Sequence, residues 1–299
     1  MAIATSAAAA APAQAQRAAA IGLADAVRVA GPMRVTAAQR PRVSSSSEAG
    51  DGGAKTAAKR QPAAAPTAPA PVPAPAPAPA AGPLLFNGEH LSDFPLLQEA
   101  PGAITEAPDP AGSGSVFQMT VDEGDVAPIT PTENPRAQAV SPDLIEDGDE
   151  FWMATKFLIP QDFPDIPGWL ALVGVYGAPY NGTGPWGIEV SNNRLQWMRN
   201  RTYGWDVPWS MPLVKGSWTT VLLHERFGTD GWVEMWINGQ QVSFFGRETK
   251  LAMQTKDSSN GGGPNSVRIS QYREAGMFET GTLYFGALKI GSSRESVGG

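Results

Sequence analysis

The amino-acid sequence predicts an all-β sandwich of two antiparallel sheets over residues 83–299, preceded by a disordered Ala/Pro-rich segment over residues 1–82. Helical periodicity is hard to find after Gly82, whereas short apolar and aromatic runs recur between Gly, Pro, Asn and Asp. About a dozen such runs follow one another, as two packed sheets require. No internal repeat of fixed period is visible, which argues against a propeller.

The N-terminal segment has the composition of a disordered leader. Residues 1–82 are dominated by Ala and Pro and contain no Trp, Tyr or Phe, so they cannot bury enough apolar surface to offset their ordering entropy. The first fifteen residues end in Ala-Gln-Ala but lack a basic start and a strongly apolar stretch. They fit a degenerate signal peptide or plain low complexity, and we expect a secreted or envelope-attached protein.

The strands follow one another in a definite order. The run 169–177 is almost continuously apolar, which predicts a central strand, and Asn238-Gly239 predicts a tight hairpin turn. The segment 84–94 is interpreted as an opening strand with an Asn-Gly turn. The predicted strand segments are 84–94, 114–121, 136–140, 150–160, 169–177, 186–190, 194–205, 218–227, 231–245, 266–278 and 282–291.

Charge and cysteine content exclude several classes of function. The leader carries a net charge of +5 and the remaining chain −12, so the domain is a poor candidate for binding nucleic acid. An anionic substrate would therefore need a local basic cleft. The chain has no cysteine, which excludes disulfides, thiolate metal sites and Cys nucleophiles. No run of about 18 apolar residues occurs, and no membrane span is predicted.

Short motifs spread along the domain carry a family resemblance. They are Arg136-Ala-Gln138, Gly148-Asp-Glu150 before a Trp-containing strand, Gly216-x-Trp218, the Gly231 to Gly239 hairpin with Trp236-x-Asn-Gly, and Tyr272-x-x-Ala-Gly276. In this order the chain resembles polysaccharide lyases of the heparin lyase I type, which share a concanavalin A-like jelly roll with alginate and glucuronan lyases. The resemblance implies that substrate lies along one sheet and that a uronate-containing glycan is cleaved by β-elimination.

The family's catalytic motifs transfer only in part. Related lyases use motifs close to R-x-E-x-R, Q-I-H and Y-F-K-A-G-V-Y. Arg136 and Gln138 match the first motif, whereas at the second Gly174 stands where Gln belongs and Tyr176 where His belongs. At the third motif, Glu274 and Phe278 replace the Lys and the last Tyr. The usual carboxyl neutraliser and base are thus both replaced.

Other residues are therefore candidates for the chemistry. Tyr176 and His224 are the proton-transfer candidates, and Arg136 and Gln138 complete the expected catalytic set as carboxylate binders. The segment 199–209 is the only stretch that combines basic and aromatic residues, as sugar and carboxylate binding would require. The expected substrate-binding residues are Arg199, Arg201, Tyr203, Trp205, Trp209, Tyr272 and Arg273.

Each candidate also has a structural alternative. Arg136 fits a rim ion pair, Tyr176 a core tyrosine, His224 a satisfied structural histidine, and the segment 199–209 a packed loop that covers a sheet edge. Oxygen-bearing side chains in the loop 257–265 suit Ca²⁺, although a plain hairpin loop is the preferred interpretation and no cofactor is expected.

Three functions remain open at this point. The leading hypothesis is a monomeric polysaccharide lyase that acts on a uronate-containing glycan. The alternative is a non-catalytic carbohydrate-binding or adhesion sandwich, which the replaced motif positions favour. A hydrolase ranks third: Glu225 and Glu234 are present, but Glu234, in the hairpin, lacks an obvious paired acid a few residues away.

Overall fold

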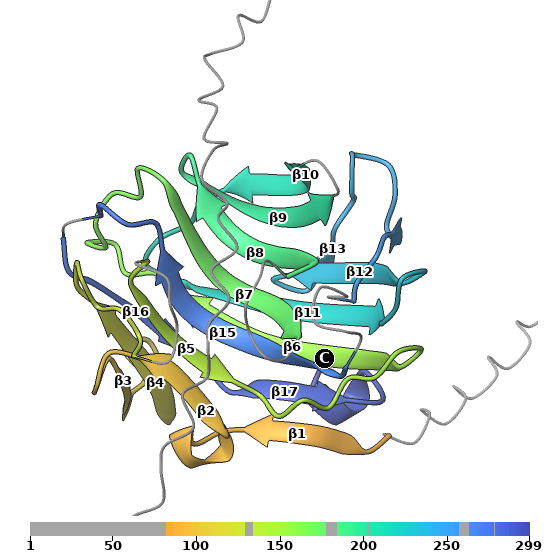
Figure 1. Ribbon diagram of the computed structural model, residues 1–299, viewed down its shortest axis with the longest axis horizontal. Coiled ribbons are helices and arrows are strands. Elements are labelled where there is room, and N and C mark those ends of the chain that lie inside the picture. The colour runs from red at the N-terminus through yellow and green to blue at the C-terminus, as the bar shows by residue number, and fades with distance from the viewer. Residues whose placement is uncertain (1–81, 129–133, 178–183, 202–203, 257–262, 278) are drawn as a thin grey trace, which may run out of the picture. The chain divides into compact units, whose positions relative to one another are not determined.

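The domain is built from two antiparallel β-sheets packed face to face (Figure 1), which confirms the predicted all-β class. The computed structural model describes residues 82–128, 134–177, 184–201, 204–256, 263–277 and 279–299. Within these residues the only helices are two single 3₁₀ turns, η1 (Leu91–Asp93) and η2 (Glu295–Val297). No helix in the described part of the chain is long and apolar enough to cross a membrane.

The smaller sheet has seven strands, and the predicted central strand β7 lies at its centre. Its neighbours on both sides are long, curved strands that are well displayed in Figure 1. In order across the sheet the strands are β10 (Gly204–Pro212), β9 (Arg194–Arg201), β8 (Trp186–Ser191), β7 (Trp169–Gly177), β15 (Asn265–Arg273), β5 (Arg136–Val140) and β2 (Leu96–Glu99).

The larger sheet has ten strands and forms the other layer. Its main path is β13 (Gln240–Gln241), β12 (Trp232–Ile237), β11 (Trp218–Arg226), β6 (Glu150–Leu158), β16 (Gly281–Phe285), β4 (Ser115–Val121) and β3 (Ile104–Pro108). Three strands pair outside this path, namely β1 (Leu84–Gly88), β17 (Leu288–Gly291) and β14 (Leu251–Ala252).

The hairpin turn was predicted well and the short strands were not. Asn238 and Gly239 join β12 to β13 with φ angles of 52° and 77°, the left-handed values that a two-residue turn requires. By contrast, 84–94 divides into β1 and η1, and neither β2 nor β3 was predicted. With four and five residues, these strands are too short to show a clear two-residue alternation.

The core lies between the two sheets and is filled by every second side chain. From the smaller sheet, Trp186 and Ile188 on β8 are buried, and from the larger sheet Met153 and Leu223 are buried against them in the same cluster. Each such side chain contributes about 1.5–3 kcal/mol to folding by leaving water. Burial of this face fixes which residues of each strand point away from the core.

One carboxyl group is buried in this apolar layer. Glu225 lies on β11 between Leu223 and Phe227 and is fully buried. Burial in this apolar layer raises its pKa well above 4.5. The folded protein therefore holds Glu225 in its protonated form over a pH range in which the unfolded chain has already lost the proton.

This burial predicts a stabilising substitution, Glu225→Gln. Since the folded-state pKa is raised, the wild type loses stability as pH rises from about 4.5 toward the folded pKa, whereas glutamine does not ionise. The variant should be more stable than wild type, by on the order of 1–3 kcal/mol at pH 8, with a smaller difference at pH 4. Urea unfolding at both pH values measures this, and a pH-independent difference would contradict it.

Candidate functional site

The outer face of the seven-stranded sheet, here called the pocket face, gathers polar and aromatic side chains. The register pairs Arg136 with Tyr272 and Gln138 with Ser270, and it sets Arg268 opposite Gly174. Ala137 and Ala139, on either side of Gln138 in β5, belong to the core. Alternation on β5 therefore sends Arg136 and Gln138 outward.

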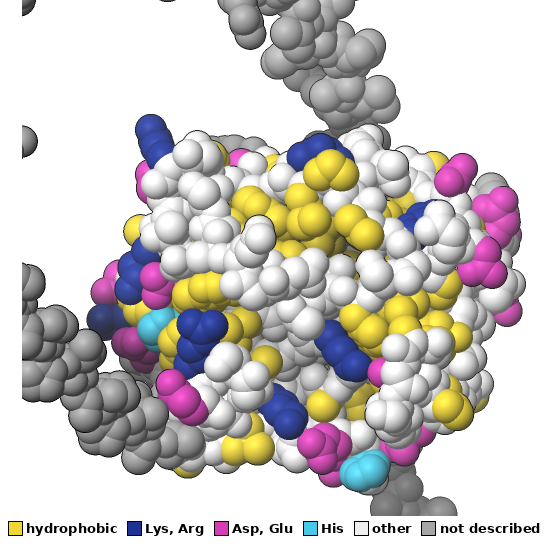
Figure 2. Space-filling model, turned by 180° about the vertical axis from the view of Figure 1, so that it is seen from behind, with side chains coloured by type: hydrophobic (Ala, Val, Ile, Leu, Met, Phe, Trp, Pro, Cys, Tyr) yellow, Lys and Arg dark blue, Asp and Glu magenta, His cyan; other side chains and the backbone are white. Residues whose placement is uncertain are grey.

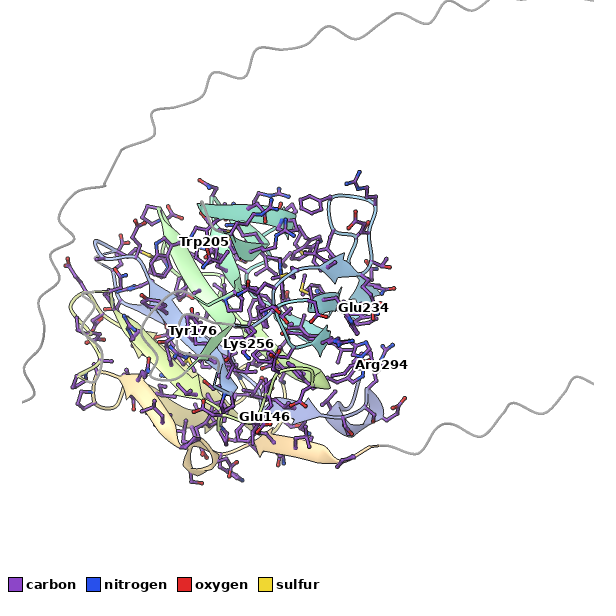
Figure 3. The ribbon with its side chains drawn as sticks, turned by 45° about the vertical axis from the view of Figure 1, so that its right-hand side comes forward. Glu146, Tyr176, Trp205, Glu234, Lys256 and Arg294 are labelled. Carbon is purple, nitrogen blue, oxygen red and sulfur yellow. The ribbon has the colours of Figure 1, made fainter. Side chains whose placement is uncertain are left out.

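A pocket of about 390 Å³ opens on this face. Ala171 is the small residue in its lining, and larger side chains stand around it. Figure 3 shows Tyr176 and Trp205 on the same side of the domain. The residues that line the pocket are Asn134, Trp169, Ala171, Tyr176, Glu189, Met198, Trp205 and Tyr272.

Tyr176 and Arg268 form the first pair of the site. The Arg268 guanidinium carbon lies 4.0 Å from the centre of the Tyr176 ring, and its Nη1 donates to Gln98 Oε1 at 3.4 Å. A Cβ at position 174 would lie 2.9 Å from the Tyr176 ring, so glycine at this position lets the ring lie low over the sheet. The residue that replaces the family's Gln thus makes space for the Tyr176 ring.

The ionisation of Tyr176 follows from the same surroundings. Burial raises the pKa of its hydroxyl above 10, and the positive charge of Arg268 opposes part of that rise. The hydroxyl therefore keeps its proton at neutral pH, which suits a proton donor.

Arg136 and Tyr272 form the second pair. The Arg136 guanidinium carbon lies 4.2 Å from the centre of the Tyr272 ring, and the Tyr272 hydroxyl accepts from Asn134 Nδ2 at 3.3 Å. The Asn134 amide is oriented by the backbone N–H of Ala275, which donates to its Oδ1 at 3.2 Å. Both cation–π pairs thus hold an arginine beside a tyrosine on one sheet face.

Glu189 is a pocket residue that the sequence analysis missed. It lies on β8, where Trp186, Ile188 and Val190 are buried in the core, so alternation turns its carboxyl toward the pocket. Its Oε1 accepts from Gln196 Nε2 at 3.0 Å, and burial raises its pKa above 4.5. The sequence signal that could have identified this position is a single acidic residue among apolar ones.

The segment 199–209 contributes less to the pocket than expected. Arg199 donates through Nε and Nη2 to Asp206 at 2.9 and 2.6 Å, and Arg201 also donates to Asp206, at 3.1 Å. Arg199 lies opposite the core residue Trp186, which turns it away from the pocket face. The two arginines are thus engaged by a carboxylate of the same hairpin.

The aromatic residues of this segment divide between the two faces. Trp205 lines the pocket, whereas Trp209 lies opposite Trp197 and packs against the core. Tyr203 lies outside the described residues.

Arg273 points in the opposite direction from its neighbour Tyr272. It is fully buried on the core side, where its Nη1 donates to the backbone carbonyl of Glu279 at 2.8 Å. Burial lowers its pKa, and the acidic groups Asp122 and Asp125 oppose that effect. The arginine of β15 on the pocket face is therefore Arg268, and Arg273 is not brought to the pocket.

His224 lies on the outer face of the ten-stranded sheet, away from Tyr176. Its ring stacks on Trp152 with centroids 4.1 Å apart, and its Nε2 and Nδ1 lie 2.8 and 3.1 Å from oxygens of Glu150 and Glu234. Figure 3 shows Glu234 on a different side of the domain from Tyr176. The structure therefore separates the two expected proton-transfer residues.

Seen from behind, the surface of the domain carries patches of hydrophobic side chains that are interrupted by basic side chains (Figure 2).

Two expectations concern residues beyond the described part of the chain. Most of the loop 257–265, considered for Ca²⁺, and Phe278 of the third motif are not described. Among the residues that are described, no three His, Asp or Glu side chains gather as a metal site would require.

Comparison with known families gives a match over most of the domain. A family model described as polysaccharide lyase matches residues 86–289. No curated protein matches the chain.

The solved structures to which this chain is similar include two lyases and a calreticulin domain. Endo-β-1,4-glucuronan lyase from the fungus Trichoderma reesei superposes with a TM-score of 0.56 and 17% identity, over 72% of this chain and 98% of that chain. At this identity the likeness shows a shared fold. The PL-14 alginate lyase from Aplysia kurodai gives a TM-score of 0.47 and 12% identity over 71% and 100% of the two chains. The globular domain of T. cruzi calreticulin gives 0.47 and 10% over 72% and 90%.

The contact between Arg268 and Tyr176 predicts a measurable change in ionisation. Arg268→Gln should raise the Tyr176 pKa further, because the positive charge that favours the phenolate is lost. The measurement is a spectrophotometric titration of tyrosine absorbance, with Tyr176→Phe used to identify this group among the five tyrosines. An unchanged titration of Tyr176 in the Arg268→Gln variant would refute the electrostatic contact.

Proposed function

The chain belongs to the polysaccharide lyase family, and on that premise we propose that it cleaves a uronate-containing polysaccharide by β-elimination on the pocket face. The observation that carries the proposal is the meeting of Arg136, Arg268 and Tyr176 on one sheet face beside a pocket. The two buried guanidinium groups beside the pocket supply the local positive charge that an anionic substrate needs on an acidic domain. Since the substrate is a polymer, we also propose that the protein acts outside the cytoplasm.

The two arginines supply the electrostatic part of the reaction. Removing the proton at C5 of a uronate sends charge into the adjacent carboxylate, so a cation placed there stabilises the transition state more than the ground state. Arg136 and Arg268 lie on neighbouring strands, β5 and β15, and Gln138 lies on the same face. We assign the substrate carboxylate to this group.

Tyr176 supplies the proton for the leaving group. Its pKa is raised by burial, so at neutral pH the hydroxyl holds a proton that it can donate to the glycosidic oxygen as the C4–O bond breaks. The exposed ring of Trp205, which also lines the pocket, offers a flat apolar surface for a sugar ring.

A non-catalytic carbohydrate-binding sandwich is the second candidate. It is favoured by the replaced motif positions, since Gly174 and Glu274 stand where related lyases carry Gln and Lys. Such a protein would bind a uronate glycan on the same face without producing an unsaturated sugar.

The proposal predicts a selective loss of activity in Tyr176→Phe. The purified protein is incubated with a panel of uronate glycans, and the ultraviolet absorbance of the unsaturated product is followed. Removing the hydroxyl should lower kcat by about 100-fold to 10,000-fold, the usual contribution of a positioned acid or base.

His224→Gln serves as the control, because His224 lies on the outer face of the other sheet and should leave kcat unchanged. Retained glycan binding with no product from the wild-type protein would favour the binding module. Full activity of Tyr176→Phe would exclude the assigned role.

A further inference from the structure

We propose that Glu189 is the general base of the reaction and that Tyr176 is the acid, so two different side chains handle the two protons. This inference rests on the proposed β-elimination and assigns the group that removes the C5 proton. His224 is on the outer face of the opposite sheet and Arg273 is in the core, so neither reaches the pocket. Within the described residues, Glu189 is the carboxylate that lines it.

The position of Glu189 supports the assignment. β8 is paired directly to β7, and the register sets Glu189 opposite Ala171, whose small side chain leaves the space above it open. Tyr176 stands on β7 and lines the same pocket as Glu189. A sugar ring bound there would have the carboxylate and the phenol on its border.

The surroundings also give Glu189 the right chemical properties. Gln196 Nε2 holds Oε1 at 3.0 Å, and Oε2 has no hydrogen-bond partner among the described residues, so it is available to a substrate proton. Burial raises its pKa, which makes it a stronger base than an exposed carboxylate. Gln196 lowers the pKa in part, and the other ionisable groups that face the site are Tyr176, Tyr272, Arg136 and Arg268.

The proposed step balances without any co-reactant. Glu189 takes the C5 proton, and the C–H electron pair moves into the substrate carboxylate beside Arg136 and Arg268. The pair then returns to form the C4–C5 double bond as the C4–O bond breaks, and the glycosidic oxygen receives the Tyr176 proton. When the products leave, the proton on Glu189 returns through water to the Tyr176 phenolate.

A substrate with an activated leaving group separates the two roles. A uronate that carries fluoride at C4 needs a base but no acid, because fluoride leaves without protonation. Tyr176→Phe should therefore be impaired on the glycan yet close to wild type on the fluoride. Glu189→Gln should lose about 100-fold or more in kcat on both substrates, since proton abstraction is common to both.

Two further variants distinguish a role of Glu189 in proton transfer from a purely structural role. Gln196→Leu removes the hydrogen bond that lowers the Glu189 pKa, so the acidic limb of the kcat/KM profile should move to higher pH with little change in the plateau. Glu189→Asp keeps the carboxylate and should retain more activity than Glu189→Gln. Thermal melts confirm that each variant is folded.

The possible outcomes separate this inference from the function on which it rests. Wild-type activity that survives in Glu189→Gln overturns the assignment of the base and leaves the lyase activity intact. Rescue of Glu189→Gln by the fluoride would make Glu189 the acid and also overturn it. Absence of unsaturated product from the wild type on every uronate substrate would overturn the proposed function and this inference together.

Discussion

The two-residue alternation of the seven-stranded sheet is the constraint on which the site depends. One face of each strand must enter the core, so the register that buries Ala137, Ile188 and Ile269 also sends Gln138, Glu189 and Arg268 outward. A slip of one residue would place guanidinium and carboxylate groups between the sheets, at a cost of several kcal/mol each. The apolar core therefore orders the polar face, although none of its atoms enters the chemistry.

Small residues turn this polar face into a pocket. A sheet that carried large side chains at every outward position would present a filled surface, and Ala171 interrupts it at the pocket. Gly174 leaves the space in which the Tyr176 ring lies over its own strand, beside Arg268. In the family motif the position of Gly174 carries an amide. Here the space that it leaves is what brings a phenol and an arginine together.

The sequence was sufficient for the fold and for part of the site. Long strands with clear alternation or continuous apolar character, such as 150–160 and 169–177, were predicted from pattern alone. Three residues that line the pocket, Tyr176, Trp205 and Tyr272, were among the candidates named from the sequence. Likeness to a motif was a weaker guide than alternation. It selected Arg273, whereas the neighbouring Tyr272 already implied that Arg273 faces the core.

The remaining parts of the site depend on tertiary structure. Asn134, Glu189 and Gln98 reach one sheet face from segments far apart in the chain, and only the order of strands brings them together. The ion pairs of Asp206 with Arg199 and Arg201 likewise depend on a hairpin whose pairing is shifted by a bulge. A run of basic and aromatic residues in the sequence does not show which carboxylate forms ion pairs with the arginines.

The ion pairs of Asp206 also affect the electric field around the domain. Beyond the pocket, ion pairs such as Arg199 with Asp206 and Lys256 with Asp147 cancel positive charge, and the domain keeps a large negative excess. If the substrate is the uronate polymer proposed above, it is repelled by the domain at long range and attracted only at contact. Since salt screens charges over about 8–10 Å but acts weakly on buried groups, moderate ionic strength should speed the encounter while leaving the contact with Arg136 and Arg268 largely intact. This behaviour is opposite to that of proteins that capture polyanions with an exposed basic surface.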